Sequence, residues 1–322
     1  MPFMLRAIDS PDTFLVSSEE ASLRLDKLLA LHFPSYSRTY FHYLLEQGCV
    51  LVNGKQLKKR DKPLAGDEIE VCFLLTPESD VKPEAIPLDI LYEDEDLLVI
   101  NKPAGMVVHP APGHFQGTFV NALLHHCQSI QGMDPLRPGI VHRLDKDTTG
   151  ALIAAKNPQA HAKLVALFAA RKITKKYLAI CVGTPQEGII EAPIKRDPIH
   201  RKQMAICPLE GKEAKTGVRV LAKNEQLSYV ELDLMTGRTH QIRVHMKHVN
   251  TPILGDPVYG FPNVNKKFNL NRQMLHAAYI SFPHPSSAKQ MEFHVPAPSD
   301  LNKVLDTILV HNSTSSYNKP KF

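Results

Sequence analysis

Residues 139–150 read GIVHRLDKDTTG, a charged turn between two apolar runs. Gly-Ile-Val is typical of the end of a strand, and ALIAAK, directly after the turn, is typical of a buried one. Asp147 and the threonines after it have side chains that hydrogen-bond locally, so they are typical turn formers. Asp145 follows Leu144, which we expect to point inward, and has no evident role in the turn. Asp145 is therefore a candidate for chemistry, although charged turns are common and spacing alone does not decide.

The composition is that of an ordinary soluble globular protein, with 43% apolar and 22% charged residues in 322, long enough for about two domains. The net charge of +5 is a mild bias towards polyanions and does not by itself indicate nucleic-acid binding. The five cysteines are scattered and form no C-x-x-C pair, which favours a reducing compartment. There is no signal-peptide pattern, and no apolar run approaches the ~20 residues that cross a bilayer. We therefore expect a cytoplasmic protein without membrane contact.

Residues 17–75 are predicted to form a small separate domain. LRLDKLLALHF and SRTYFHYLLEQG each place apolar residues on one helical face, and the second ends at Gly48, a helix-stop position. Asn53-Gly54 lies between short apolar runs and predicts a hairpin. DEIEVCFLL alternates like a strand with one buried face. Residues 76–88 are rich in proline and charge and indicate a linker.

Residues 89–311 are predicted to form a larger domain with irregularly mixed strands and helices. DLLVINKP, GALIAAK, KKYLAICVG and SYVELDLMTG are typical of strands, whereas QAHAKLVALFAARK and SDLNKVLDTILVH are typical of helices. Asn157 before Pro158 is a helix-start signal. The strands follow no steady βα rhythm, which favours a mixed α+β sheet over a doubly wound one. Residues 312–322 are expected to be a disordered tail.

Three basic segments could contact phosphates: KQLKKRDK (55–62), RKITKK (171–176) and HRK (200–202). Each alone is most simply a solvated face. Together, and with two arginines of the first domain, they suit backbone contacts that position a polynucleotide without reading its sequence. The candidate RNA-binding residues of the first domain are Arg24, Arg38, Lys55, Lys58 and Lys59.

Several kinds of chemistry are not indicated. The 16 histidines show no H-E-x-x-H and no Cys/His alternation with ligand spacing, so we expect no metal. KPAGMVVHPAPG has neither a Walker lysine-serine ending nor G-x-G-x-x-G, and no G-x-S-x-G elbow is present. We therefore expect no cofactor.

TGRTHQIRVHMKH (236–248) follows a strand and then becomes helical, with Ile242 and Met246 on an apolar face. Arg243, beside Ile242, could point back into a cleft. A carboxylate that must stay ionised in a partly closed pocket needs an opposite charge nearby, and arginine supplies it with two-pronged geometry. The sequence alone leaves open whether Arg243 meets Asp145.

These segments together resemble the RluA family of pseudouridine synthases. GIVHRLDKDTTG is similar to the family's signature, and INKPAGMVVHP, ITKKYLAI and TGRTHQIRVHM followed by LGDPVYG are similar to its other motifs in order. The first domain resembles an S4 RNA-binding domain through LRLDKLLA, SR and GCVLVNGK. DKDTTG, the S4-like domain in front and HMKHVNTPILGDPVYG are most similar to the RluD-like branch, which modifies large-subunit (23S) ribosomal RNA.

The resemblance implies a pseudouridine synthase fold, with a mixed, mainly antiparallel sheet, a central cleft and flanking helices. It implies an isomerase that acts without a cofactor, as a monomer, on ribosomal RNA or an assembling large subunit. Asp145 matches the catalytic aspartate, Tyr177 the base-stacking tyrosine, and Arg243 the arginine that pairs with the aspartate. Ile242 matches the adjoining apolar wall, and Arg143 the arginine that can fill the gap left by an extruded base. Many relatives have serine where Thr149 stands, and threonine keeps the hydroxyl.

Alternatives remain open at this point. The carboxylate of Asp145 could attack C1′, abstract the 2′-proton to give a glycal, or add to uracil C6. A non-catalytic RNA-binding protein would have no need of Asp145, Tyr177 and Arg243 together. A glycoside or nucleoside hydrolase predicts a second acid in a similar setting, and the sequence offers none.

Overall fold

The computed structural model describes residues 11–34, 36, 38–73, 81–109, 116–127, 130, 138–200 and 203–310. The predicted tail (312–322) and residues 76–80 of the predicted linker lie outside these ranges. The chain divides into two compact units, each described below by itself. The first comprises Met1–Pro87, His109–Ile140 and Ala155–Ala162, and the second Leu88–Val108, Val141–Ala154 and Lys163–Phe322.

The first unit contains the predicted helix pair and short strands. Helix α1 (Leu25–His32) and helix α2 (Arg38–Glu46) pack together, and three antiparallel strands form a sheet in the order β1 (Asp12–Leu15), β3 (Glu68–Val71), β2 (Val50–Val52). Of the predicted hairpin only the tight turn is present: Asn53 and Gly54 have φ of 49° and 71°. Strand β2 then pairs with β3, whereas Lys55 directly after the turn makes only a bridge to Val52. The core consists of Val16, Leu25, Leu28, Leu29, Tyr40, Phe41, Leu44, Val50, Val52, Ile69 and Val71.

Two further helices have identifiable N-terminal caps. Helix α3 (Phe119–His126) begins after Thr118, which forms a reciprocal capping box with Asn121. Helix α4 (Pro158–Ala169) begins after Asn157, whose Oδ1 accepts the N–H of Ala160 at 2.8 Å. This is the helix start that Asn157-Pro158 predicts.

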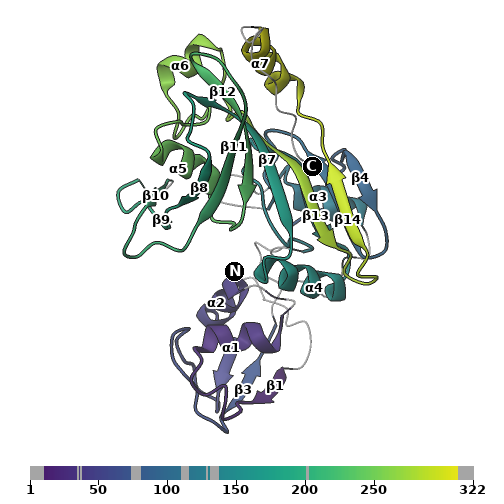
Figure 1. The fold of residues 1–322 in the computed structure, drawn as a ribbon. Helices are drawn as coiled ribbons and strands as arrows, with labels where there is room; N and C mark the ends of the chain where they lie inside the picture. Colours follow the sequence, from purple (N-terminus) through teal and green to yellow (C-terminus); the bar gives the residue numbers. More distant parts are fainter. Residues whose placement is uncertain are drawn as a thin grey trace, which may run out of the picture. The chain divides into compact units, whose positions relative to one another are not determined.

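The second unit is built on a nine-stranded sheet (Figure 1). The strand order is β4-β5-β6-β13-β7-β12-β11-β8, and β14 pairs with β13. Among the described strands of this sheet, β6 and β13 run parallel and the other registered pairs are antiparallel, which confirms the mixed, mainly antiparallel prediction. The strands are β4 (Ile90–Glu93), β5 (Leu97–Lys102), β6 (Thr149–Ala155), β7 (Thr174–Val182), β8 (Gly188–Glu191), β11 (Lys215–Lys223), β12 (Leu227–Leu234), β13 (Leu275–Pro283) and β14 (Gln290–His294).

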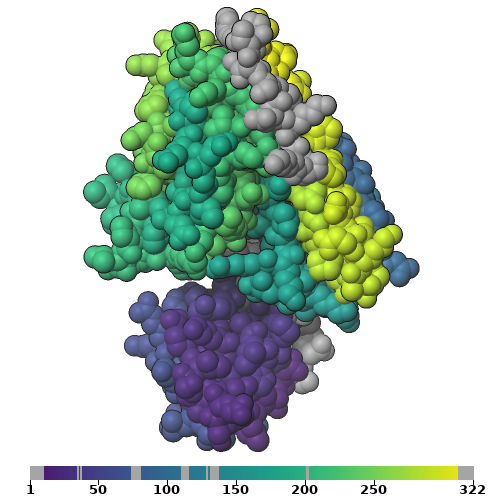
Figure 2. All heavy atoms as spheres, in the orientation of Figure 1, coloured from purple at the N-terminus to yellow at the C-terminus, as the bar shows by residue number. Residues whose placement is uncertain are grey.

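Helices and a small hairpin complete this unit. Helix α7 (Ser299–Val310) contacts β7, β11 and β12, and its predicted apolar face is buried in their core. Strand β14 alternates between exposed and half-buried residues, and the yellow surface in Figure 2 includes this strand, whereas β13 is mostly buried. The remaining elements are β9 (Ile194–Arg196), β10 (Met204–Ile206), α5 (Gln241–His248) and α6 (Pro262–Lys267).

Gly150 explains how the opening turn is placed on the sheet. It is the second residue of β6, opposite Ala277 of β13, with a φ of 111°. A Cβ at this position would lie 2.2 Å from the carbonyl oxygen of Ala277. Only glycine permits so close an approach with this backbone conformation. The glycine therefore holds the turn that contains Asp145 against the centre of the sheet.

Candidate active site

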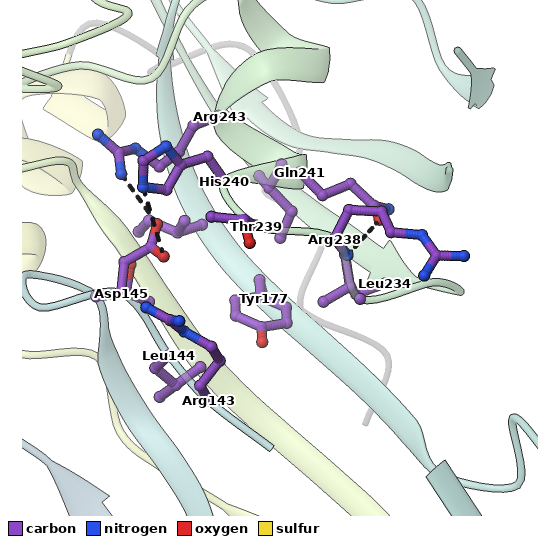
Figure 3. A pocket seen from close by; sticks show the side chains of 14 residues that line it. Arg143, Leu144, Asp145, Tyr177, Leu234, Arg238, Thr239, His240, Gln241 and Arg243 are labelled. Atoms are coloured by element: carbon purple, nitrogen blue, oxygen red, sulfur yellow. Dashed lines mark hydrogen bonds and ion pairs between the residues drawn. The ribbon is translucent and has the colours of Figure 1, made fainter. Parts of the chain in front are cut away.

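Asp145 lies in the turn that leads into β6, at the wall of a cavity of about 100 Å³ (Figure 3). Its backbone carbonyl accepts the N–H of Thr148 at 3.1 Å, which closes the turn. Leu144 points inward as predicted and is 4% exposed. The carboxylate of Asp145 keeps 18% of its side-chain surface exposed, so a ligand in the cavity can reach it.

Arg243 meets Asp145, which settles the contact that the sequence left open. Its Nη1 donates to Asp145 Oδ2 at 2.9 Å, although the two residues are 98 positions apart. Arg243 lies on α5, whose first turn also carries Ile242, 4% exposed, in the wall of the same cavity. The structure thus brings Asp145, Arg243 and Ile242 together.

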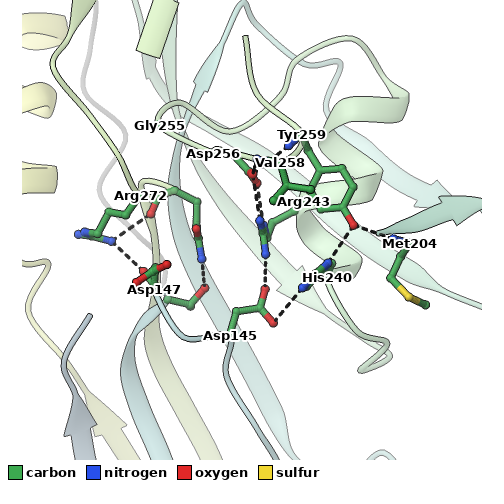
Figure 4. Close-up of polar contacts among 12 residues, drawn as sticks. Asp145, Asp147, Met204, His240, Arg243, Gly255, Asp256, Val258, Tyr259 and Arg272 are labelled. Carbon is green, nitrogen blue, oxygen red and sulfur yellow. Dashed lines mark hydrogen bonds and ion pairs between the residues drawn. The ribbon is translucent and has the colours of Figure 1, made fainter. Parts of the chain in front are cut away.

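Asp256 anchors Arg243 from the other side (Figure 4). Its two carboxylate oxygens accept from Arg243 Nε at 2.7 Å and Nη2 at 2.9 Å. Its Oδ1 also accepts the N–H groups of Val258 and Tyr259, and its side chain has no exposed surface. Burial alone would lower the pKa of Arg243, but the hydrogen bonds and charge of Asp256, with Asp145, raise it. The guanidinium is therefore a permanent cation. Asp256 binds its Nε and Nη2, which leaves Nη1 directed at Asp145.

His240 lies beside Asp145 in a defined orientation. It precedes α5 in the left-handed backbone region, with φ of 54° and ψ of 18°. The hydroxyl of Tyr259 accepts the N–H of Met204 at 2.8 Å and lies 2.8 Å from His240 Nδ1. A Tyr259 O–H donated to Nδ1 leaves the proton of a neutral imidazole on Nε2, 3.9 Å from Asp145 Oδ1. Burial lowers the pKa of His240, which favours this neutral form.

Tyr177 forms the opposite wall of the cavity. It lies on β7 with 6% of its surface exposed, and Figure 3 shows its ring between Asp145 and Arg238. Burial, and then the charge of Asp145, raise the pKa of its hydroxyl, so the phenol stays neutral across the physiological range. A neutral ring in this position can stack on a planar base.

Two buried basic residues, Lys102 and Arg272, donate to backbone carbonyls of the turn that contains Asp145. Lys102, at the end of β5, has no exposed surface, and its Nζ donates to the carbonyls of Pro103, Met106 and Lys146 at 2.8, 2.9 and 2.9 Å. Burial lowers its pKa to about 7, although the charges of Asp147 and Asp145 act in the opposite direction.

Arg272 supports the same turn through Asp147. Its Nη1 donates to the backbone carbonyl of Asp147 at 3.2 Å, while Nε and Nη2 each bind Asp300 at 2.6 Å. The backbone carbonyls of Lys146 and Asp147 are thus bound by residues distant in the sequence, which positions Asp145 without using its carboxylate.

The basic residues predicted to bind RNA fall into different settings. Arg143 is exposed and lines the cavity next to Asp145. In the first unit, Arg24 and Arg38 both bind the buried carboxylate of Asp26, at 2.9 Å and 2.5 Å. Burial alone would raise the pKa of Asp26, but hydrogen bonds from His42, Arg38 and Arg24 hold it well below its usual range. Asp26 therefore presents both arginines, each still partly exposed.

The predicted lysines of the first unit are more open. Lys55 and Lys58 are exposed, and Lys59 is half-buried with its Nζ 3.7 Å from Glu46. They remain candidates for phosphate contacts.

One cluster of possible metal ligands lies in the second unit, apart from the residues of the cavity. Asp94, Asp96 and His284 bring three ligand atoms within 4.8 Å. His284 Nε2 already lies 2.8 Å from Asp94 Oδ2, and the hydroxyl of Tyr92 donates to the same oxygen. These contacts explain the cluster without an ion. In the part of the chain that the structure describes, no helix has the length and apolar character needed to cross a membrane.

Comparison with known proteins identifies the family of this chain. The family model for RNA pseudouridylate synthases matches residues 96–248, and the S4 domain model matches residues 23–69. An uncharacterized RNA pseudouridine synthase of Bacillus subtilis, YlyB, is 44% identical over 295 residues, 91% of this chain and 96% of the relative. This chain belongs to the RNA pseudouridine synthase family. Its identification from the sequence motifs is confirmed, and with it an enzyme that isomerises uridine in RNA.

Other members of the family are similarly close. The ribosomal large subunit pseudouridine synthase D of Escherichia coli (strain K12) is 42% identical over 311 residues, 92% of this chain and 94% of the relative. Among solved structures, human RNA Pseudouridylate Synthase Domain Containing 4 has a TM-score of 0.55 at 28% identity, covering 68% of this chain and 92% of that one. The predicted fold class is confirmed by these neighbours.

Sequence reasoning missed several residues that shape the pseudouridine synthase site. Except for Arg272, they lie inside segments already singled out as motifs, but nothing in their spacing indicated buried roles. Asp256 and Tyr259 belong to LGDPVYG and His240 to TGRTHQIR, while Lys102 belongs to INKP. For Lys102, Asp256 and Tyr259, the available signal was a charged or polar residue next to proline or glycine in an otherwise apolar motif. The missed residues at this site are Lys102, His240, Asp256, Tyr259 and Arg272, and Asp26 was missed in the first unit.

Proposed function

We propose that this pseudouridine synthase converts specific uridines of large-subunit 23S ribosomal RNA to pseudouridine, with Asp145 as the reacting carboxylate. The choice of RNA is supported by the relatives named as large subunit synthases, at 42% identity over almost the whole chain. We propose a monomer that works in the cytoplasm, where bacterial ribosomes assemble. Elution of the purified chain at the mass of a dimer would contradict the first of these points.

The observation that carries the assignment is the unequal use of the two oxygens of Asp145. Oδ2 accepts from Arg243, whereas Oδ1 lies 3.9 Å from His240 Nε2, beyond direct hydrogen-bond distance. Oδ1 is thus the oxygen available to a substrate, on a carboxylate whose other oxygen binds a permanent cation. In the part of the molecule that the structure describes, the cavity lining contains no second carboxylate, which disfavours a hydrolase with paired acids.

The reaction breaks the N1–C1′ bond, turns the uracil and joins C5 to C1′; the C5 hydrogen leaves as a proton and N1 gains one. The balance needs no oxidant and no added group. In each of the three routes, attack on C1′, removal of the 2′-proton or addition to C6, Asp145 Oδ1 is the acting atom. Tyr177 would stack on the uracil, a contribution of roughly 1–3 kcal/mol per base. Ile242 closes the cavity behind Asp145 and helps to exclude water.

The uridine must leave its stack before it can react, which costs a few kcal/mol. We propose that Arg143, which is exposed and lines the cavity, fills the gap that the extruded uridine leaves in the RNA. Phosphate contacts by Arg24, Arg38 and the lysines of the S4 domain would offset the cost of extrusion. Pseudouridine mapping in ribosomal RNA from cells with and without the gene tests the substrate: unchanged 23S RNA would contradict it.

The variant Asp145→Asn tests the role of the carboxylate. We expect it to bind 23S transcripts normally but to release no tritium from 5-tritiated uridine, because the amide cannot act as nucleophile or base. Asp147→Asn is the matched control, since Asp147 lies in the same turn and contributes through its backbone carbonyl to Arg272. Near-normal tritium release by Asp145→Asn would refute the assignment.

A further inference from the structure

A second cavity, of about 490 Å³, lies directly beside the candidate active site. Its volume falls within the ~300–1,000 Å³ of pockets that hold a small organic ligand. The two cavities have five lining residues in common, so an occupant of one lies next to an occupant of the other. The shared residues are Arg143, Tyr177, Leu234, Gly237 and Arg238.

The lining of the second cavity is cationic. It includes Arg143, Arg171, Lys175 and Arg238 and, among the described residues, no carboxylate. Two of these arginines are held at the rim by Glu213: Arg171 Nη2 binds its carboxylate at 3.0 Å, and Arg238 Nε donates to its backbone carbonyl at 3.0 Å. A cavity with this lining attracts an anion.

Lys175 is the cation whose charge is least compensated. It lies two residues before Tyr177 on β7 and so on the same face of the strand, whereas Lys176 points to the other face and pairs with Glu231. Within the described parts of the chain, the ammonium of Lys175 has no hydrogen bond and no ion pair. It lies over the ring of Phe168, 5.7 Å from the ring centroid. Burial lowers the pKa of Lys175 to about 8, because removing the ammonium from water disfavours its charged form. An anion in the cavity would stabilise that charged form.

The wall formed by Phe168 and His142, next to Lys175, is aromatic and uncharged. The ring of Phe168 stacks on His142 with centroids 4.8 Å apart and an angle of 27° between the planes. His142 Nε2 accepts the N–H of Ile153 at 2.9 Å, and burial lowers the pKa of His142 to about 3, so the imidazole is neutral. Apolar residues extend this wall: Val165, Ile173 and Met235. The cavity thus combines an anion site with a surface that suits a planar base.

We propose that the second cavity holds a nucleotide next to the target uridine, with its base against the Phe168 wall and a backbone phosphate on Lys175. The inference rests on the proposed function, because a uridine bound at Asp145 brings its covalent neighbours to the shared wall. The enzyme then recognises a second nucleotide of the RNA, in addition to the extruded uridine, through the base that packs against Phe168.

The test combines protein and RNA changes in a coupling experiment. Wild type, Lys175→Gln, Lys175→Arg and the exposed control Lys303→Gln are assayed for tritium release under single turnover. The substrates are an unmodified 23S fragment and a set of modified fragments. Each modified fragment carries one neutral methylphosphonate in place of one phosphate, at the first or the second linkage on either side of the target uridine. Two further versions carry an abasic residue on either side of it.

We expect Lys175→Gln to lower kcat/KM about tenfold on the unmodified RNA, the size of one charge-assisted contact, while Lys175→Arg keeps most of the activity. One methylphosphonate should lower the wild-type rate by the same factor and leave Lys175→Gln unaffected. One abasic neighbour should also slow the wild type. The proposal is overturned if Lys175→Gln loses the same factor on every RNA, or if the wild type tolerates all modified RNAs. The latter arm does not depend on how well the variant folds. Failure of the wild type to convert unmodified 23S RNA would instead refute the proposed function.

Discussion

The anchoring of Arg243 by Asp256 makes a sharp prediction for Asp256→Asn. The substitution replaces one carboxylate oxygen by an NH2 group, which then faces N–H donors of the buried guanidinium instead of accepting from them. Asp256 has no exposed surface and Arg243 is 6% exposed on its side chain, so water cannot replace the lost partner. The variant therefore leaves a buried cation with Asp145 as its remaining carboxylate.

The magnitude follows from the burial of this pair. Breaking a buried ion pair by removing one partner costs about 3–5 kcal/mol. For a unit of 150–250 residues each kcal/mol lowers Tm by about 2–4 °C, so we expect Tm to fall by roughly 10 °C. Arg243 is also no longer held in position against Asp145. A misplacement of about 1 Å at a reacting group can lower the rate ~10²-fold. We expect kcat/KM to fall by about that factor.

The matched comparison is Asp145→Asn, which touches the same guanidinium from the open side. Asp145 is 18% exposed and Arg243 keeps both bonds to Asp256, so Tm should stay within about 2 °C while turnover stops. The chain has no tryptophan, so unfolding is followed by far-UV circular dichroism, with hydrogen exchange of the α5 peptide to locate the change. An equal loss of Tm in both variants, or full activity in Asp256→Asn, would show that Asp256 is not the anchor.

Three further outcomes are expected. Gly150→Ala should lower Tm by several degrees or prevent folding, because a Cβ would meet the Ala277 carbonyl at 2.2 Å, and a soluble variant with unchanged Tm would contradict this packing. Tyr177→Leu should reduce kcat/KM by about 10- to 100-fold through lost stacking while leaving S4-dependent RNA binding intact, as tritium release and a gel-shift assay can show. Asp26 has a pKa lowered by His42, Arg38 and Arg24, so it stabilises the folded first unit above its unfolded pKa of about 3.9 and loses that contribution as the pH falls below this value. Denaturant titrations at pH 6 and pH 3 measure the free energy of unfolding. Between these two pH values it should fall further in the wild type than in Asp26→Asn, and equal decreases would refute the assignment.

Much of the fold could be predicted because its elements have strong local patterns. The apolar periodicity of α1 and α7 and the alternation of β3 concern neighbours within about two turns or a few strand residues, and Asn157-Pro158 marked the start of α4. The absence of a steady βα rhythm indicated a mixed sheet. Strand order was not predicted, since pairing β13 between β6 and β7 depends on segments more than a hundred residues apart.

The candidate site shows the same division. By itself the sequence predicted which segments carry chemistry. Its local pattern marked Asp147 as a turn former, but spacing alone did not decide the role of Asp145, and the resemblance to the family assigned it the catalytic role. The sequence could not determine that Arg243 binds Asp145, that Asp256 and Lys102 hold the site from behind, or that Asp26 gathers Arg24 and Arg38. Those roles depend on burial and on atoms brought within about 3 Å from distant segments, as charge-assisted hydrogen bonds require. The turn at 139–150 presents its aspartate because the glycine, the lysine and two arginines that position it meet only when the sheet has formed.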